Sequence, residues 1–206
     1  MSVRRGVRPL ALVTLLAALM AVAVVTQSAG AVSVDTVTGG QSKLFVPLKV
    51  VQQLNKDRII SSPNGGAYIT FVSNEGPAVV FPISDGLVES ATMLGTVNHP
   101  GGLTIQKVDQ NFHVTKELVA TNFKIVNGTT LVGTILNLVP APQGDLINTS
   151  HSKDPSTGVI TYQADVQLNL VTTTVLNTYF DTNVFTPGTI LGHLVSQIQT
   201  KKVIGL

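Results

Sequence analysis

Histidine is the residue type in this chain best suited to metal binding or proton transfer at neutral pH. The four histidines are spread along the sequence, at His99, His113, His151 and His193. No two of them have the i, i+4 spacing or the short spacing of a metal-ligand pair, and there is no cysteine to complete a zinc site. The sequence therefore predicts no metal site and no cofactor.

His99 has the most distinctive surroundings of the four. It follows a strand-like run that begins at Gly95, and Pro100, Gly101 and Gly102 separate it from a second such run. Adjacent glycines favour a tight turn, so we expect a hairpin corner from which His99 projects. The simpler interpretation is that the imidazole bonds to loop carbonyls around it. A functional role would need a second ligand or proton partner nearby, which the sequence does not place.

Other reaction types have no signature in the sequence. There is no Gly-x-Ser-x-Gly elbow, and none of the glycine pairs opens a long helix as a phosphate-binding loop would. The 11 acidic residues are dispersed, so no pair of catalytic carboxylates is indicated. We therefore predict that the protein is not an enzyme.

Most of the chain has the composition of strands joined by tight turns. From Ile160 to Leu170, apolar residues occupy one parity and polar residues the other, which predicts a long strand with one solvated face. Shorter strands are expected over residues 67–72, 78–83, 93–97, 103–106, 119–126, 131–138 and 190–198. The polar stretch 143–157 is interpreted as an exposed loop.

Two segments depart from the strand pattern. Pro47 suits a first helical position, and Val50, Val51 and Leu54 then fall on one face of a short helix that ends near Asp57.

A second short helix is predicted from Thr172 to Phe180. Both helices follow strand-like residues and contain Leu-Asn, so a diverged duplication and chance similarity both stay open. The fold class predicted is mainly β: an antiparallel, β-sandwich-like domain with two short helices.

The beginning of the chain has the pattern of an export signal. Three arginines lie among the first eight residues, an apolar run extends from Leu10 to Val25, and Ala29-Gly30-Ala31 provides small residues for cleavage before Val32. Residues 1–31 are therefore predicted to be a cleaved signal peptide, and residues 32–206 a single secreted, β-rich domain.

Removing this leader changes the charge of the protein. The 13 basic residues fall to 10 against 11 acidic ones, so the formal net charge becomes −1 instead of +2. Without clusters of Lys and Arg, nucleic acid is not an expected partner. No later apolar run approaches the roughly 20 residues of a membrane helix. Long strands with free edges lead us to expect self-association or contact with an envelope component.

Three short motifs carry a resemblance to a known family. They are Phe81-Pro82-Ile83, the segment from Gly95 to Leu103, and Asn122-Phe123-Lys124-Ile125, which together resemble the core of HtaA-like domains of secreted and surface proteins of actinobacteria. Residues 176–180 and 185–188 are similar to the tail of uncharacterised secreted proteins of that type. The resemblance extends over roughly Leu44 to Leu194.

The resemblance implies a possible haem site. In haem-uptake members of the family a tyrosine ligates the haem iron, supported by a histidine, and His99 matches that supporting histidine. The ligating tyrosine of the family lies in the N-terminal segment, whereas residues 32–67 contain no tyrosine. Tyr68 is the nearest phenol, and its apolar strand pattern favours a packed side chain over an iron ligand.

The function predicted from the sequence is that of a secreted, non-catalytic binding or structural protein of the cell envelope or the extracellular space. The first alternative is a haem-binding or haem-relay protein of HtaA-like type. The second is a hydrolase of envelope polymers, which would require polar side chains gathered in a pocket.

Overall fold

The computed structural model describes residues 34–73, 75–135 and 141–202, so the predicted signal peptide and its cleavage site lie outside the described residues. The described elements, in chain order, are β1 (Val34–Phe45), α2 (Leu48–Lys56), β2 (Ile59–Asn64), β3 (Tyr68–Val72), β4 (Gly76–Pro82), β5 (Asp85–Glu89), β6 (Gly95–His99), β7 (Gly102–Val108), β8 (Val114–Val126), β9 (Thr130–Ile135), β10 (Ala141–Lys153), β11 (Val159–Gln167), α3 (Leu170–Phe180) and β12 (Ile190–Lys202). Neither of these two helices is long and apolar enough to cross a membrane.

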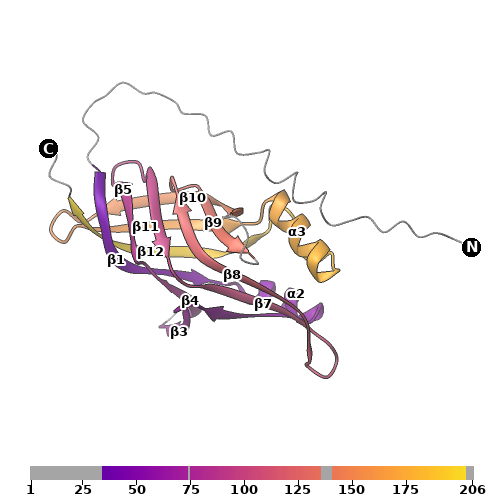
Figure 1. The fold of residues 1–206 in the computed structure, drawn as a ribbon. Helices are drawn as coiled ribbons and strands as arrows, with labels where there is room; N and C mark the ends of the chain where they lie inside the picture. The colour runs from indigo at the N-terminus through magenta and orange to yellow at the C-terminus, as the bar shows by residue number, and fades with distance from the viewer. Residues whose placement is uncertain (1–33, 74, 136–140, 203–206) are drawn as a thin grey trace, which may run out of the picture. The chain divides into compact units, whose positions relative to one another are not determined.

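Eight of the strands form a closed antiparallel ring (Figure 1). The order is β1-β12-β11-β10-β9-β8-β6-β5, and β5 pairs with β1 again. The ring closes because β1 pairs with β12 along its length, from Asp35 opposite Lys202 to Phe45 opposite His193. The prediction of a mainly antiparallel β fold with two short helices is therefore confirmed, and the prediction of a sandwich is wrong. A period-2 pattern is shared by both architectures, so it does not reveal which strands join across the chain.

At two places in the ring, two short strands follow one another along a single long partner strand, with a break in pairing between them. β4 and β5 both pair with β1, one after the other, and β6 and β7 both pair with β8. The predicted hairpin corner after His99 is therefore wrong, because β6 and β7 run in the same direction along β8. Gly102 is needed for close approach: a Cβ there would lie 1.9 Å from the Ala120 carbonyl oxygen.

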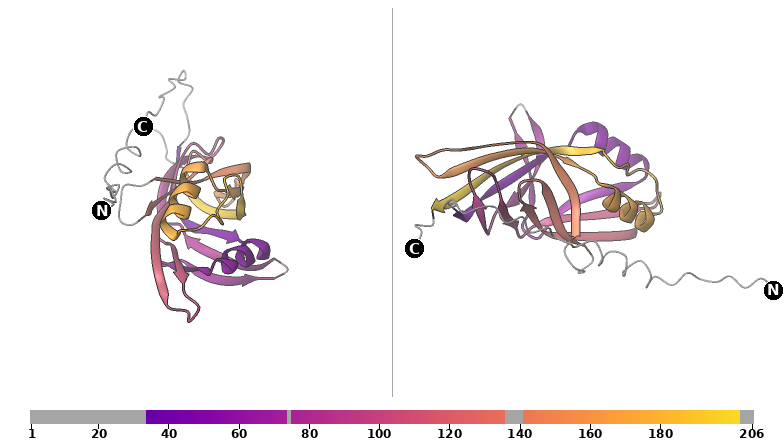
Figure 2. Two further views of the ribbon diagram at one scale, coloured as in Figure 1. Left: turned by 90° about the vertical axis from the view of Figure 1, so that its right-hand side faces the viewer. Right: turned by 90° about the horizontal axis from the view of Figure 1, so that it is seen from above.

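Beyond these breaks the ring widens. β4 is joined by β3, and β7 is joined by β2, whereas β2 and β3 are consecutive along the chain and do not pair with each other. Helices α2 and α3 lie at this same end of the barrel (Figures 1 and 2). This end therefore contains the parts of the barrel that strand pairing does not close.

The opposite end of the barrel, where β1 begins, is densely filled. Val37, Val88, Ile160 and Ile198 are almost inaccessible to solvent and belong to one hydrophobic core. Close packing of such residues is the main source of stability in a chain without cysteines.

Both predicted helices are present. The first was predicted to end near Asp57, and α2 ends at Lys56 with Asp57 as its C-cap. The second begins at Leu170 rather than Thr172, because the Asn169 side chain accepts a hydrogen bond from the Thr172 backbone N–H and caps the helix. This cap also ends the long predicted strand, which the structure shows as β11.

The loop predicted over residues 143–157 is wrong, because most of it belongs to β10. The irregular pattern has a structural cause: the register between β10 and β11 shifts between Ile147 and Ser150, and Asn148 has a φ of 52°. A bulge of this kind breaks the alternation that identifies a strand. Strands β1, β2 and β5 were also missed, and residues 136–138 of the strand predicted at 131–138 lie outside the described residues.

Candidate functional site

The widened end of the barrel contains an apolar cavity of about 110 Å³. Leucines from several strands line it, among them Leu44, Leu103, Leu131 and Leu194. Helix α3 contributes Thr172 and Leu176, which are the helical residues in the lining. A cavity of this composition excludes water and suits an apolar guest.

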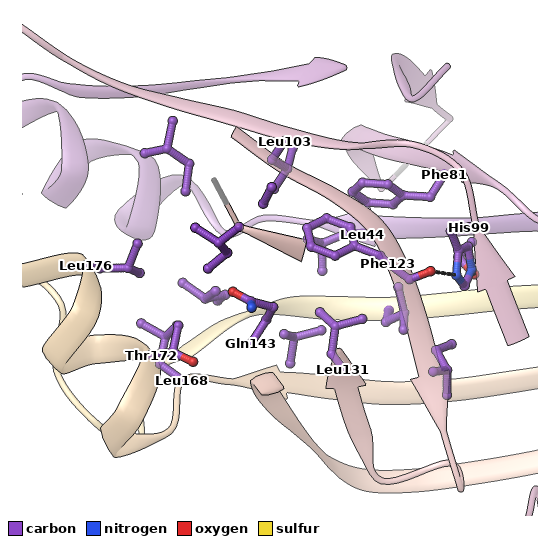
Figure 3. A pocket seen from close by; sticks show the side chains of 18 of the residues that line it. Leu44, Phe81, His99, Leu103, Phe123, Leu131, Gln143, Leu168, Thr172 and Leu176 are labelled. Atoms are coloured by element: carbon purple, nitrogen blue, oxygen red, sulfur yellow. Dashed lines mark hydrogen bonds between the residues drawn. The ribbon is translucent and has the colours of Figure 1, made fainter. Parts of the chain in front are cut away.

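Polar side chains in the lining are few and lie apart. Ser42 and His99 are at one end of the cavity, and Figure 3 shows Thr172 and Leu176 of α3 at the other. Gln143 donates from Nε2 to the carbonyl oxygens of Gly133 and Ala141, at 3.2 and 2.9 Å. No residue of the lining carries a charge at neutral pH, since His99 is its one titratable group.

His99 is buried and bonded through both of its ring nitrogens. It is 3% exposed, its Nε2 lies 2.8 Å from Ser42 Oγ, and its Nδ1 lies 3.3 Å from the Phe123 carbonyl oxygen. Ser42 Oγ in turn lies 2.6 Å from Ser196 Oγ. His99 was predicted to project from a turn, and the structure places it inside the barrel instead.

The strand register explains how these side chains meet. Ser42 on β1 lies directly opposite Ser196 on β12, and His99 on β6 lies opposite Phe123 on β8. Sequence analysis missed both serines. A signal was present, because Ser196 has the same parity as the buried Leu194 and Ile198, and a serine at such a position must find a hydrogen-bond partner.

Burial controls the protonation of His99. It lowers the pKa of the imidazole to about 4, and the backbone carbonyls of Phe123 and Val97 raise it only in part. The imidazole is therefore neutral at neutral pH. A neutral imidazole can bind a metal ion, but a pKa so far below 7 makes it a weak general base.

The structure does not bring Tyr68 and His99 together in the cavity. Tyr68 lies on β3, is 49% exposed, and is absent from the cavity lining. The two other tyrosines of the chain are also absent from the lining: Tyr162 donates to the Gly128 carbonyl oxygen and Tyr179 to that of Glu117. The cavity therefore contains an imidazole and no phenol.

The remaining histidines are on the surface and form no metal site. His193 Nδ1 lies 2.9 Å from Asp165 Oδ1, and His113 Nδ1 lies 3.3 Å from Asp109 Oδ2. Across the described residues, no group of three or more His, Asp or Glu side chains could hold a metal ion.

Helix α3 covers its end of the cavity through side-chain contacts. Thr172 Oγ1 donates to the Pro142 carbonyl oxygen at 3.1 Å near the start of the helix. At its end, Lys107 Nζ donates to the carbonyl oxygens of Phe180 and Asp181, at 2.7 and 3.0 Å. Unlike the strands of the ring, this cover has no backbone ladder to either neighbour.

The fold and its interior define a closed antiparallel barrel with a partly hollow core. Comparison with protein-family models and with curated proteins finds no match. Among solved structures, the chain is similar to the C-terminal domain of HtaA from Corynebacterium glutamicum, with a TM-score of 0.58 and 18% identity over 81% of this chain and 99% of that one. It is also similar to the heme-binding protein HtaB from the same organism, with a TM-score of 0.52 and 13% identity over 82% and 96% of the two chains.

These likenesses confirm the predicted resemblance to HtaA-like domains at the level of the fold. They also correct one prediction. The absence of any cofactor was predicted because the sequence has no ligand motif, and that prediction is wrong as stated, since HtaB has the same fold and is a heme-binding protein.

Proposed function

We propose that this protein is an exported, non-catalytic binding protein and that its ligand is haem. The observation that carries the proposal is a neutral imidazole, His99, at one end of an apolar cavity inside a fold shared with the heme-binding protein HtaB. Histidine is a common axial ligand of haem iron, and an apolar enclosure suits the macrocycle. The donor chemistry of the interior therefore fits haem.

The size of the cavity sets a condition on binding. Its volume of about 110 Å³ is well below the roughly 300–1,000 Å³ of ordinary ligand pockets. A large ligand enters only if part of the wall moves. Helix α3 is attached to the barrel by side-chain contacts and not by a strand ladder, so its displacement would break no ladder, which supports it as the entrance.

Titration with haemin tests the proposal, using protein that begins at Val32. We expect a shifted and sharpened Soret band, and we expect His99→Ala to weaken binding by about tenfold or more through loss of the axial ligand. His193→Ala is the matched control, because His193 lies on the outer face beside Asp165 and should bind like wild type.

Tyr68→Phe distinguishes between the two candidate ligands. We expect it to bind haemin like wild type, because Tyr68 does not line the cavity. A loss confined to Tyr68→Phe would assign the iron ligand to β3 instead. An unchanged haemin spectrum on addition of folded wild-type protein would refute the proposed function.

The geometry at Ser42 and His99 suits a binding protein better than a hydrolase. Ser42 and His99 are within hydrogen-bonding distance, as a nucleophile and its base would be. The group at His99 Nδ1, however, is a backbone carbonyl and not a carboxylate, and the depressed pKa leaves the imidazole a poor base. This arrangement favours binding over hydrolysis.

N-terminal sequencing of exported protein, expected to begin at Val32, tests the proposed export.

We also propose that the protein self-associates through the edge of β3. Among the described strands β3 pairs with β4 alone, and residues 66–73 carry no charge. Phe71 is 81% exposed and Ile69 is exposed beside it. An uncharged apolar edge strand favours pairing with a second such strand.

Sedimentation at increasing concentration checks this expectation. Wild type should associate, and Phe71→Lys should remain monomeric, because a charge on the edge opposes pairing. Leu87→Lys is the control: Leu87 is also exposed, but its strand β5 already has a partner on each side. Wild type that stays monomeric, or equal effects of the two substitutions, would contradict the proposal.

A further inference from the structure

Two lysine side chains on the inner face of the barrel lie directly opposite each other. They are Lys107 on β7 and Lys116 on β8, which are partners in the strand register. The neighbouring partners on the same face, Ile105 and Leu118, line the cavity. Side chains two positions apart on a strand point to the same side and are separated by about 7 Å. The two lysines therefore lie just beyond the cavity lining.

This position is also next to the end of helix α3. Lys107 Nζ donates to the last carbonyl oxygens of the helix. The Tyr179 hydroxyl donates to the carbonyl oxygen of Glu117, the residue that follows Lys116. Figure 1 shows α3 and the strands β7 and β8 reaching the same end of the barrel. The lysine pair therefore lies at the proposed entrance to the cavity.

No acid neutralises the two ammonium groups. The three ion pairs among the described residues include neither lysine. The carboxylate of Glu117 accepts a hydrogen bond from Gln106 instead. Lys107 bonds to uncharged carbonyl groups, and Lys116 has no side-chain hydrogen bond within the described part of the chain. Like charges directly opposite each other destabilise a sheet, so an anionic group between these lysines would remove an unfavourable interaction.

We propose that Lys107 and Lys116 bind the carboxylate groups of the ligand, which is an apolar molecule that enters with its apolar part first and keeps its carboxylates at the entrance. The inference rests on the proposed function, because haem has an apolar macrocycle with two propionate groups on one edge. It concerns the propionates and is independent of how the iron is held.

Lys107 connects this site to the movement of α3. Displacement of the helix takes away the two carbonyl acceptors of Lys107, and a ligand carboxylate replaces them. A hydrogen bond between two charged groups is stronger than one to a neutral carbonyl. Binding of the carboxylate therefore offsets part of the cost of opening the cavity.

Titrations with haemin and with its dimethyl ester test the proposal, because the ester has the same macrocycle and iron but no negative carboxylates. Wild type should bind haemin more tightly than the ester, and 1 M NaCl should reduce this preference. Lys116→Met should weaken haemin binding about 3- to 10-fold and leave ester binding within about twofold of wild type. Lys116→Arg, which keeps the charge, should retain the preference.

Lys124→Met is the matched control. Lys124 is on the same strand, opposite Asn98, and it points to the outer face because its neighbours Phe123 and Ile125 are buried inside. The substitution makes the same change in net charge, and it should leave both affinities unchanged. An equal loss in Lys116→Met and Lys124→Met would assign the effect to net charge and overturn the inference.

Thermal melting without ligand separates a binding role of Lys116 from a structural one. Removal of the repulsion with Lys107 should raise the melting temperature of Lys116→Met by about 1–3 °C at low salt, and by less in 1 M NaCl. A structural lysine would give the opposite result. A lowered melting temperature in Lys116→Met would therefore overturn the inference.

Failure of the inference and failure of the proposed function give different results. If wild type binds haemin and the ester equally, the carboxylate site is refuted and the proposed function stands. If it binds neither, the proposed function fails, and dodecanoate and dodecanol then probe the lysines. A preference for dodecanoate that Lys116→Met removes would support the carboxylate site with another apolar ligand. Equal binding of these two probes, or no binding of dodecanoate, would refute it.

Discussion

Asp35 is a carboxylate placed inside the barrel, where β1 begins. It is 1% exposed, and its Oδ2 accepts a hydrogen bond from Lys153 Nζ at 2.6 Å. Burial raises the pKa of Asp35, but the hydrogen bonds from Lys153 and Ser90 outweigh it and hold the pKa below its ordinary value of 3.8. A carboxyl group whose pKa is lowered by folding contributes stability above its ordinary pKa, and this stability is lost as the pH falls through the lowered value.

Removing the lysine should reverse this dependence. Lys153→Met removes the ammonium group that pairs with the buried carboxylate, and we expect a loss of about 3 kcal/mol in the free energy of unfolding at pH 7. Burial then raises the pKa of Asp35 in the folded variant, so the variant should recover stability relative to wild type as the pH falls towards 4.

Urea unfolding at both pH values measures this effect. Lys201→Met is the control, because Lys201 is exposed on β12, and it should change stability by less than about 0.5 kcal/mol. A deficit in Lys153→Met that is the same at both pH values would show that the ion pair does not control stability.

The candidate site was predictable at the residue scale only in part. His99 was singled out because its neighbours are Pro100 and two glycines, and it does line the cavity. Its burial was not predictable, because Gly102 serves close contact with β8 rather than a turn. Its partner Ser42 lies 57 positions away in sequence, and only the closed ring brings the two together.

Helix α3 is the element on which access to the cavity depends. Its start is capped by Asn169, and its last carbonyls accept hydrogen bonds from Lys107 on β7. A cation at this position also interacts favourably with the negative end of the helix dipole. The strands of the ring have no such dependence on single side chains, since each is held by a ladder on both sides.

Lys107→Met should therefore loosen the last turn of α3. We expect faster amide hydrogen exchange over residues 177–180 and a loss of about 1 kcal/mol in stability, with the ladder of the ring unchanged. Lys116→Met is the matched control, because Lys116 lies opposite Lys107 in the β7–β8 pair. Equal protection of α3 in both variants would show that Lys107 does not hold the helix.

At the scale of the whole molecule, local sequence patterns predicted individual elements, but the pairing of strands far apart in the chain could not be predicted from them. The alternation from Ile160 onward identified β11, and Pro47 identified the start of α2. The choice between a sandwich and a barrel depends on β1, whose pattern includes Gly39, Gly40 and the inward Ser42 and was not recognised as a strand. The ring is closed by the first and last of the described strands, whose paired residues are 148 to 167 positions apart, and no short window of sequence contains that information.

The barrel is filled with side chains where β1 begins, and it is hollow beyond Ser42 and His99. The folded protein therefore includes an apolar space of about 110 Å³ that its own atoms do not fill. Unfolding eliminates this space, so the unfolded chain with its solvent takes up less volume than the folded one. Hydrostatic pressure consequently favours unfolding, and a ligand that fills the cavity would raise the pressure needed to unfold the barrel.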